Sequence, residues 1–233
     1  MVNVQGVLGQ LKVCIVIPVY NEAQAIGTLV KELRAKHLDV VVINDGSSDQ
    51  SGKIAQQQGA IVLQHEVKKG KGLSLQTGFR YALEQHYDSI IAMDGDGQHA
   101  VEDVDRFIEK AKGFPLSIIN GNRMENHREM PFVRFWTNRI MSVLISCLCK
   151  QKIPDTQCGF RLISTQILRQ LTLAAGDFEI ETEVLIKASK KGFKIYSVPI
   201  KTIYRGEVSH INPILDTVRF FVYIFKETWN SKN

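Results

Sequence analysis

Short apolar runs alternate with longer amphipathic stretches along the first half of the chain. The runs are rich in β-branched residues and predict five strands, over residues 12–17, 39–44, 60–64, 88–93 and 115–121. The stretches between them carry apolar residues at helical spacing and predict four helices, over residues 22–36, 48–59, 72–86 and 101–112. This order indicates an α/β fold, with a mostly parallel sheet covered by helices on both faces.

Polar loops follow three of the predicted strands. They read PVYNE at residues 18–22, DGSSD at 45–49 and DGDGQ at 94–98. Right-handed crossovers bring the carboxyl ends of parallel strands to one edge of the sheet, which is where ligands of such sheets bind. We therefore expect the three loops to form one binding site.

The pattern changes after residue 121. Residues 122–152 are basic and aromatic and contain no obvious strand; six arginines and lysines there stand against two glutamates, a net +4 out of +5 for the whole chain. Farther on, the pattern predicts a helix over 180–192, strands near 194–203 and an amphipathic helix over 212–229.

Composition narrows the class of protein. The 233 residues are 44% hydrophobic and 23% charged, as expected for one globular domain with a large core. The mild positive charge permits an anionic partner, but nothing else points to nucleic acid. No CxxC pair, signal peptide or run of about 20 apolar residues is found, which predicts a cytoplasmic protein with reduced thiols.

Asp94 and Asp96 raise a question, because two carboxylates at the end of a buried strand repel each other. Without a cation, this repulsion raises one of the two pKa values. Mg²⁺ or Mn²⁺ would turn the repulsion into attraction, and Gln98 offers a further carbonyl oxygen. The alternative is an ordinary Asp-Gly surface turn. A calcium EF-hand is disfavoured because His99 stands where that loop needs glycine, and His99 is expected to pack in the loop rather than bind metal.

Two further polar segments have both a structural and a functional interpretation. Asp45 either belongs to a plain turn or accepts hydrogen bonds from a nucleobase, while Asp49 is expected at a helix N-terminus. The segment KKGKG at 68–72, which includes Lys71, is either a solvated basic loop or a phosphate cradle. It lacks the full P-loop pattern, so a Walker-type NTPase is disfavoured.

Taken together, the motifs CIVIPVYNEAQAI, VVVINDGSSDQS, KGKG and AMDGDGQH resemble the nucleotide-sugar-binding half of family 2 glycosyltransferases, which have the GT-A fold. The motifs GNR, DTQCGFRLIS and YRGEVSHINP resemble the synthases of dolichyl-phosphate mannose and glucose. The resemblance extends from about residue 12 to about residue 216. It implies a single Rossmann-like GT-A domain over 1–211, with a nucleotide-sugar half (about 12–121) and an acceptor half (about 122–211), followed by a C-terminal helix over 212–233.

The resemblance also implies roles for individual residues. The positions that match nucleotide-sugar ligands of the family are Pro18, Tyr20, Glu22, Asp45, Lys71, Asp94, Gly95, Asp96 and Arg123. Asp94, Asp96 and Gln98 match its metal ligands, and Asp96 and Arg123 match residues that act on the diphosphate. One departure concerns the segment RGEVSH, where Arg205 matches an arginine of the family but His210 stands where lysine is expected.

No Glu-Asp pair stands where many family members carry the general base for inverting transfer. Asp155, Glu179 and Glu181 are the nearest carboxylates in the sequence. A phosphate acceptor would need no base, because its oxygen is already ionised near pH 7, and this favours a polyprenyl phosphate. The alternatives are a soluble hydroxyl acceptor with Asp155 as base, or a non-catalytic module that binds nucleotide-sugar.

The basic segment 122–152 fits such an acceptor. Arg134 and Arg139, with Arg128, Arg205 and His210, could pair with its phosphate or with anionic headgroups. Phe132, Phe135 and Trp136 could lie at the membrane interface, so we expect peripheral attachment to the cytoplasmic face of a membrane. The alternative is an ordinary amphipathic helix that closes the edge of the sheet. The C-terminal helix could likewise contact a membrane, a membrane partner or a second subunit.

Overall fold

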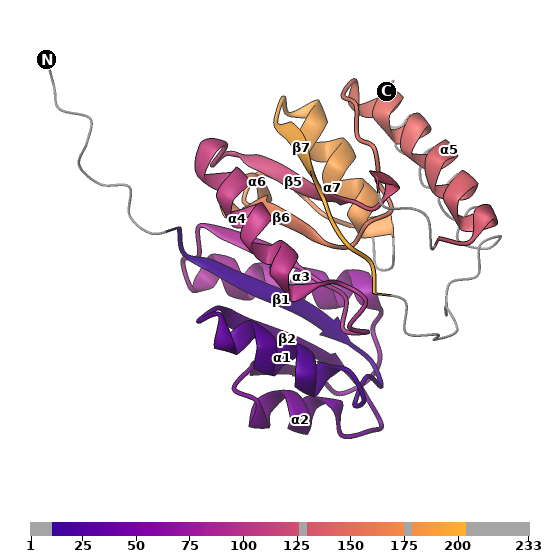
Figure 1. The fold of residues 1–233 in the computed structure, drawn as a ribbon. Coiled ribbons are helices and arrows are strands. Elements are labelled where there is room, and N and C mark those ends of the chain that lie inside the picture. The colour runs from indigo at the N-terminus through magenta and orange to yellow at the C-terminus, as the bar shows by residue number, and fades with distance from the viewer. Residues whose placement is uncertain (1–10, 126–129, 175–178, 204–233) are drawn as a thin grey trace, which may run out of the picture.

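The computed structural model describes residues 11–125, 130–174 and 179–203. In these ranges the elements follow in the order β1 (Val13–Val19), α1 (Ile26–Ala35), β2 (Asp39–Asp45), α2 (Ser51–Gln57), β3 (Ile61–His65), α3 (Lys71–Glu84), β4 (Ser89–Ala92), the 3₁₀ turn η1 (Val101–Asp103), α4 (Val104–Gly113), β5 (Ser117–Asn122), α5 (Phe132–Cys149), β6 (Arg161–Ser164), α6 (Thr165–Leu168), α7 (Glu179–Lys190) and β7 (Lys194–Pro199). Figure 1 shows their arrangement.

The strands form one seven-stranded sheet in the order β3-β2-β1-β4-β6-β5-β7. The pairs β1–β2, β1–β4, β2–β3 and β5–β7 are parallel, whereas β6 runs antiparallel to both β4 and β5. The predicted α/β fold with a mostly parallel sheet is therefore confirmed. A single sheet contains strands from both predicted halves of the domain: β6 of the second half lies between β4 and β5 of the first, and β7 pairs with β5.

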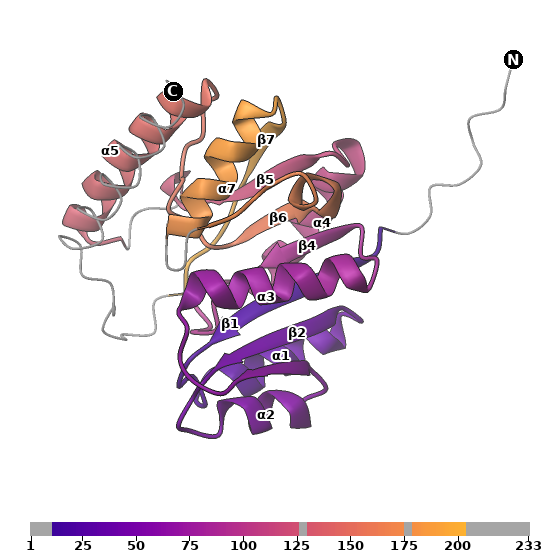
Figure 2. The same ribbon diagram turned by 180° about the vertical axis from the view of Figure 1, so that it is seen from behind.

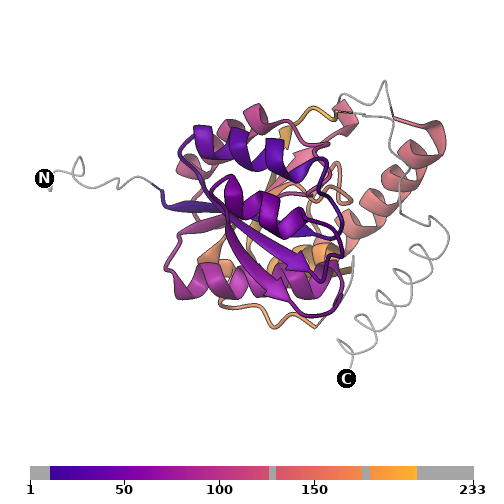
Figure 3. The same ribbon diagram turned by 90° about the horizontal axis from the view of Figure 1, so that it is seen from below.

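Helices cover both faces of this sheet, as the view from behind and the view from below show (Figures 2 and 3). One apolar cluster packs α1, α2 and α4 against β1 through residues such as Ile15, Leu33 and Phe107. The other packs α3, α5, α6 and α7 against the opposite face through residues such as Val16, Phe79 and Leu185. Neighbouring positions of β1 thus face opposite cores, which explains why its sequence is apolar throughout.

Most of the predicted elements are confirmed, with three differences. The first helix begins at Ile26 and not at 22, because the Glu22 carbonyl accepts the amides of Ala25 and Ile26 in a turn. The short strand β6 was not expected from the sequence, since only four residues of the motif DTQCGFRLIS are extended. The strand predicted near 194–203 ends at Pro199, with one isolated bridge from Thr202 to His99 beyond it. The helix predicted over 212–229 lies outside the described residues.

Within the segment 122–152, for which no strand was expected, Phe132–Cys149 form the long helix α5. It packs on α7 at the periphery of the molecule (Figures 1 and 2). In the described part of the chain it is the one helix long and apolar enough to cross a membrane, by length and composition alone, although the sequence had predicted no spanning segment. Only 28% of it is buried, so packing in the core does not explain why the helix is so apolar.

Candidate active site

The carboxyl ends of β1, β2 and β4 meet at one edge of the sheet, as predicted. Their register pairs Val19 of β1 with Asn44 of β2, and Val16 with Ala92 at the end of β4. The polar loops 20–23, 46–49 and 93–98 start from these strand ends. Gly95 allows the last loop to lie against β1, because a Cβ there would be 3.0 Å from Val19 Cγ2 and 3.3 Å from the Pro18 carbonyl.

Asp45 lies at the end of β2, but its side chain is only 5% exposed. One carboxylate oxygen accepts the amide of Lys69 (2.9 Å) and pairs with His65 Nδ1 (2.7 Å), and the other accepts the amide of Gly70 (2.8 Å). Burial opposes ionisation of Asp45, yet the hydrogen bonds from His65, Lys69 and Gly70 outweigh it and lower its pKa. In this conformation Asp45 holds the loop before α3 in place, and its contact with a nucleobase stays a prediction.

The loop after β1 is joined to the loop after β2. Asp49 accepts the amides of Ala23 (3.1 Å) and Ser51 (2.9 Å), and the Ser51 hydroxyl accepts the amide of Glu22 (2.8 Å). Asp49 therefore lies near the start of α2, as predicted, and also fixes Glu22. Tyr20 is 41% exposed, with the Lys68 ammonium 3.8 Å from its ring centroid, so the ring forms an open aromatic surface at the rim.

Asp94 and Asp96 follow β4 and differ in their electrostatics. Burial disfavours the charge of Asp94, but the Lys71 ammonium and His99 outweigh burial and hold its pKa well below its usual range. Burial and the negative charge of Asp94 raise the pKa of Asp96, as expected for neighbouring carboxylates. Asp96 accepts the amide of Gln98 (2.9 Å), which keeps the loop compact. The role of Gln98 as a metal ligand stays a prediction.

Lys71, the first residue of α3, links two carboxylates from distant parts of the chain. Its ammonium lies 2.5 Å from Asp94 Oδ1 and 2.7 Å from Glu181 Oε1. Burial alone would lower its pKa, but the two carboxylates raise it above its usual range. The sequence named Glu181 as one of three carboxylates close to the position where many family members carry the general base. The structure places it beside Asp94, with the Lys71 ammonium between them. His99 packs on the ring of Phe160 at 4.9 Å between centroids, as a packing residue should, and its Nε2 lies 3.4 Å from Asp94 Oδ2.

The same contacts show that a divalent cation fits here. The Lys71 ammonium lies against Asp94, which shows that the negative charge at this position stabilises a cation. A Cβ at Gly159 would lie 2.8 Å from Asp94 Oδ2 and 3.0 Å from Glu181 Oε1, so the glycine keeps the space before both carboxylates open. Among the described residues, no three His, Cys, Asp or Glu side chains form a closed metal site. This arrangement suits Mg²⁺ or Mn²⁺, which use one or two carboxylates and complete their shell with substrate phosphates.

Arg123 and Asp155 form a buried pair behind the site. The guanidinium donates from Nε to Asp155 Oδ2 (2.8 Å) and from Nη2 to Oδ1 (3.0 Å), and Asp155 is fully buried. Burial would lower the pKa of Arg123, but Asp155 raises it strongly, and Asp94 contributes in the same direction. The alternative in which Asp155 serves as general base is therefore disfavoured, because both of its oxygens already bind Arg123 and no solvent reaches them. Asp155 orients Arg123 instead.

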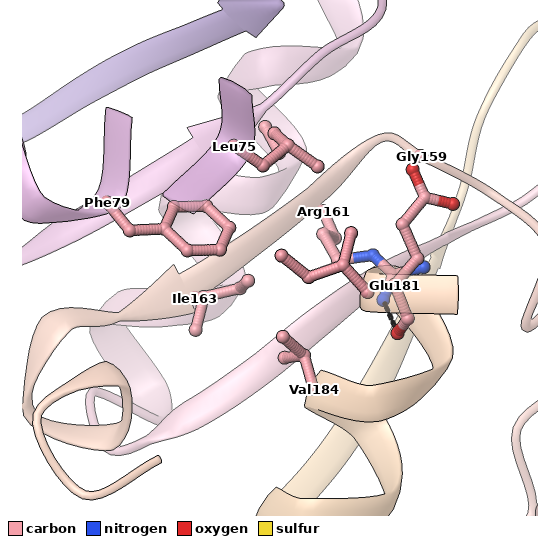
Figure 4. Close-up of a pocket in the computed structure, with 9 residues that line it drawn as sticks. Leu75, Phe79, Gly159, Arg161, Ile163, Glu181 and Val184 are labelled. Atoms are coloured by element: carbon pink, nitrogen blue, oxygen red, sulfur yellow. Dashed lines mark hydrogen bonds between the residues drawn. The ribbon is translucent and has the colours of Figure 1, made fainter. Parts of the chain in front are cut away.

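Arg161, which the sequence analysis had assigned no role, joins the motif DTQCGFR to α7. Its buried guanidinium donates to the backbone carbonyls of Glu181 (2.6 Å) and Cys158 (2.7 Å). A small cavity of about 10 Å³ lies beside it, too small for any nucleotide. Figure 4 shows its lining by Leu75, Phe79, Gly159, Arg161, Ile163, Glu181 and Val184. Arg161 thus positions the start of α7, and with it Glu181.

The residues expected to bind the acceptor phosphate are only partly described. Arg134 and Arg139 lie on α5, where Arg139 is exposed and Arg134 half-buried. Arg128, Arg205 and His210 lie outside the described residues, so their roles stay predictions.

Comparison with known proteins gives this site its context. A model of glycosyl transferase family 2 matches residues 14–172. The chain belongs to glycosyltransferase family 2. The family resemblance seen in the sequence motifs is thereby confirmed, and the protein is a transferase.

Named relatives of this family 2 glycosyltransferase act on polyprenyl phosphates. It is 31% identical over 213 residues to the UDP-N-acetylglucosamine–dolichyl-phosphate N-acetylglucosaminyltransferase of Methanococcus voltae, covering 82% of this chain and 85% of the relative. It is 27% identical over 209 residues to the undecaprenyl-phosphate mannosyltransferase of Micrococcus luteus, covering 84% and 85%.

Solved structures confirm the GT-A fold of this family 2 glycosyltransferase. Glucosyl-3-phosphoglycerate synthase of Mycobacterium tuberculosis, in complex with phosphoglyceric acid, superposes with a TM-score of 0.69 at 19% identity, over 84% of this chain and 73% of the synthase. The same synthase in complex with Mn²⁺, uridine diphosphate and glucosyl-3-phosphoglycerate gives a TM-score of 0.66 at 20% identity, over the same shares. At this identity the likeness concerns the fold alone.

Proposed function

We propose that this family 2 glycosyltransferase moves a sugar, with inversion, from a nucleoside-diphosphate sugar to a polyprenyl phosphate, with Mg²⁺ or Mn²⁺ as cofactor. The observation that carries the proposal is the pair Asp94 and Asp96 at the carboxyl end of β4, with Lys71 and Arg123 in electrostatic contact with Asp94. The printed names of the relatives support the acceptor, and the metal and uridine diphosphate bound by the mycobacterial synthase support the cofactor and donor.

In the proposed reaction, an acceptor phosphate oxygen attacks the anomeric carbon while the bond from that carbon to the diphosphate breaks. The leaving nucleoside diphosphate gains negative charge, which a divalent cation bound to Asp94 and Asp96 would neutralise. Arg123 adds donors, since Asp155 engages only its Nε and Nη2 groups and fixes the guanidinium plane. Lys71 stands at the N-terminus of α3, where the helix dipole also favours a phosphate.

The pairing of both Asp155 oxygens with Arg123 supports the proposed acceptor class. An acceptor phosphate is ionised near pH 7 and attacks without losing a proton, whereas a hydroxyl must lose one. Of the three carboxylates considered from the sequence, Glu181 is the one that lies beside Asp94, and there it is paired with Lys71. Of these three carboxylates, Glu181 would have to leave that ion pair to act as base for a soluble acceptor.

A donor panel tests this function. Purified enzyme with Mn²⁺ is offered UDP- and GDP-linked hexoses, each with a short polyprenyl phosphate, the corresponding polyprenol or a soluble sugar. We expect nucleoside diphosphate release and a glycosylated lipid only with the phosphate. Asp96→Asn should abolish transfer, whereas Asp105→Asn, an exposed aspartate on α4, should not. Transfer to the polyprenol or the soluble sugar at a comparable rate would contradict the proposed acceptor.

The exposed side of α5 supports peripheral attachment to a membrane. Its large exposed apolar side chains are Phe132, Val133, Trp136, Ile140, Val143 and Leu144, and Arg139 lies among them. Aromatic and aliphatic groups next to arginine suit an interface with anionic headgroups, where each basic residue contributes about 1 kcal/mol.

Liposome flotation tests this attachment. Wild type should float with vesicles that contain anionic lipid at low salt and float less at high salt. Ile140→Glu should reduce flotation, because it places a charge on the exposed face of α5. Leu116→Glu, at a comparably exposed apolar position away from α5, is the matched control and should float as wild type does. Equal flotation of the two variants would show that α5 does not contact the membrane.

A further inference from the structure

The ion pair between Lys71 and Asp94 conflicts with the role expected of Asp94. Asp94 Oδ1 is 2.5 Å from the Lys71 ammonium, which also lies 2.7 Å from Glu181 Oε1. The ammonium therefore sits between the two carboxylates that Gly159 leaves open to a cation. A metal ion that binds Asp94 Oδ1 from this side must replace the ammonium, since two cations do not share one small site.

The local charges explain why lysine occupies this position. Asp94 lies close to Glu181 and its charge also acts on Asp96, so without a cation Asp94 would be repelled by both carboxylates. The Lys71 side chain is 17% exposed and projects from the first residue of α3, and its flexible four-carbon stem allows the ammonium to move from the carboxylates to another anion nearby. Arg123 cannot take over, because Asp155 holds it in a two-point pair.

A diphosphate offers Lys71 a new partner. Lys71 is the first residue of α3, and a helix N-terminus favours a phosphate, so a phosphate bound there would lie within reach of the ammonium. Once Lys71 turns to the phosphate, Asp94 is free to bind a metal ion, which the phosphate oxygens also ligate. The nucleotide would thus create the metal site in two ways, by adding ligands and by removing a competing cation.

We propose, building on the proposed function, that Lys71 is an internal cation that takes the place of the metal ion at Asp94, held there by Glu181 as well, until the nucleotide diphosphate draws it away. Lys71 is then a positioning residue that sets the order of binding, nucleotide before metal or both together. Glu181 is the second anchor of the resting position.

Mn²⁺ binding, followed by the electron paramagnetic resonance signal of free Mn²⁺, tests this without a turnover measurement. Wild type should bind Mn²⁺ weakly when it is offered alone and strongly with UDP or GDP, whichever it binds. Lys71→Met should bind Mn²⁺ alone about tenfold more tightly or better, because a unit positive charge beside the site is gone. Lys71→Arg keeps the charge and should behave as wild type does with Mn²⁺ alone.

Lys69→Met is the matched control, because Lys69 lies in the same loop but its side chain is exposed. It should leave Mn²⁺ binding unchanged. If Lys71→Met binds Mn²⁺ alone no better than wild type while wild type still needs nucleotide for tight binding, the internal-cation role is wrong and the proposed function stands. If wild type binds no Mn²⁺ even with nucleotide, the proposed function itself fails. A thermal unfolding curve for each variant ensures that only folded protein is compared.

Discussion

At the scale of single residues, Asp155 shows how burial decides between two chemical roles. A carboxylate that is fully buried and bound at both oxygens by Arg123 stabilises a cation rather than accepting a proton. Removing one partner of such a pair leaves the other charge buried and uncompensated. The substitution should therefore be felt mainly in stability.

Asp155→Asn is expected to lower the free energy of unfolding by about 3–5 kcal/mol, measured by denaturant titration. The folded fraction should lose turnover only modestly, because Arg123 is less well oriented, whereas loss of a true general base costs about 10²–10⁴-fold. Asp105→Asn is the control, since its pair with Lys36 is on the surface and is worth less than about 1 kcal/mol. An unchanged stability together with a loss of turnover above about 10²-fold would restore Asp155 as the base.

Asp45 supports a second prediction at this scale. Asp45→Ala should weaken nucleoside diphosphate binding by roughly 1.5–3 kcal/mol in titration calorimetry, because hydrogen bonds to a charged group are lost. The contacts of the buried Asp45 side chain give a second reason to expect weaker binding. Without this side chain the amides of Lys69 and Gly70 lose their acceptor, so the loop before Lys71 is held less firmly.

Asp49→Ala is the comparison for Asp45. It releases the amides of Ala23 and Ser51 and should mainly weaken the start of α2. Normal binding by Asp45→Ala with none by Asp49→Ala would show that the wrong aspartate has been assigned to the nucleotide.

At the scale of elements, α3 lies unusually close to β1 and β2. A Cβ at Gly78 would overlap Val16 Cγ1 and lie 2.9 Å from Ile43 Cδ1. The close approach matters for the site, because α3 carries Lys71 at its first position and its packing fixes where the ammonium can reach.

Gly78→Ala should lower the free energy of unfolding by about 1–3 kcal/mol, the usual cost of inserting atoms into a packed core. Gly113→Ala, at the end of α4, is the matched control: no atom lies within 4 Å of the added Cβ, so stability should stay the same or rise slightly. Both are measured by thermal and denaturant unfolding. Equal stabilities for the two variants would mean that α3 can shift away from the sheet at little cost.

At the scale of the whole molecule, the site joins regions that are far apart in the sequence. Asp94 follows β4, Lys71 begins α3 and Glu181 belongs to α7, and all three meet in one set of ion pairs. A ligand that binds there should therefore stabilise the whole domain and not one half of it.

Mn²⁺ and nucleoside diphosphate together should raise the midpoint of thermal unfolding by roughly 5 °C or more, because ligand at 100 times its dissociation constant adds about 2.7 kcal/mol. Mn²⁺ alone should have little effect, and a chelator should remove most of the shift. In Asp96→Ala the nucleotide should shift the midpoint equally with and without metal. A full shift in wild type with nucleotide and chelator would show that nucleotide binding does not need the cation.

The sequence by itself determined the architecture and the edge of the sheet at which the site lies. Apolar runs that alternate with amphipathic stretches allow little besides a mostly parallel sheet covered on both faces, and polar loops after β1, β2 and β4 must then meet. Asp94 and Asp96 could be found in this way, because both carboxylates belong to one short loop and their spacing of two residues is enough to predict that they repel each other.

Only the tertiary structure decided what each charged side chain is paired with. Asp155 becomes a partner of Arg123, Glu181 becomes a partner of Lys71, and Asp45 turns inward to the loop before α3. The four-residue strand β6, antiparallel between β4 and β5, makes the first two of these encounters possible by bringing the second half of the chain against the first. Spacing along a sequence carries no information about such contacts, since they depend on how separate segments pack across the same sheet, whether 25 residues apart, as for Asp45 and Gly70, or 32, as for Arg123 and Asp155.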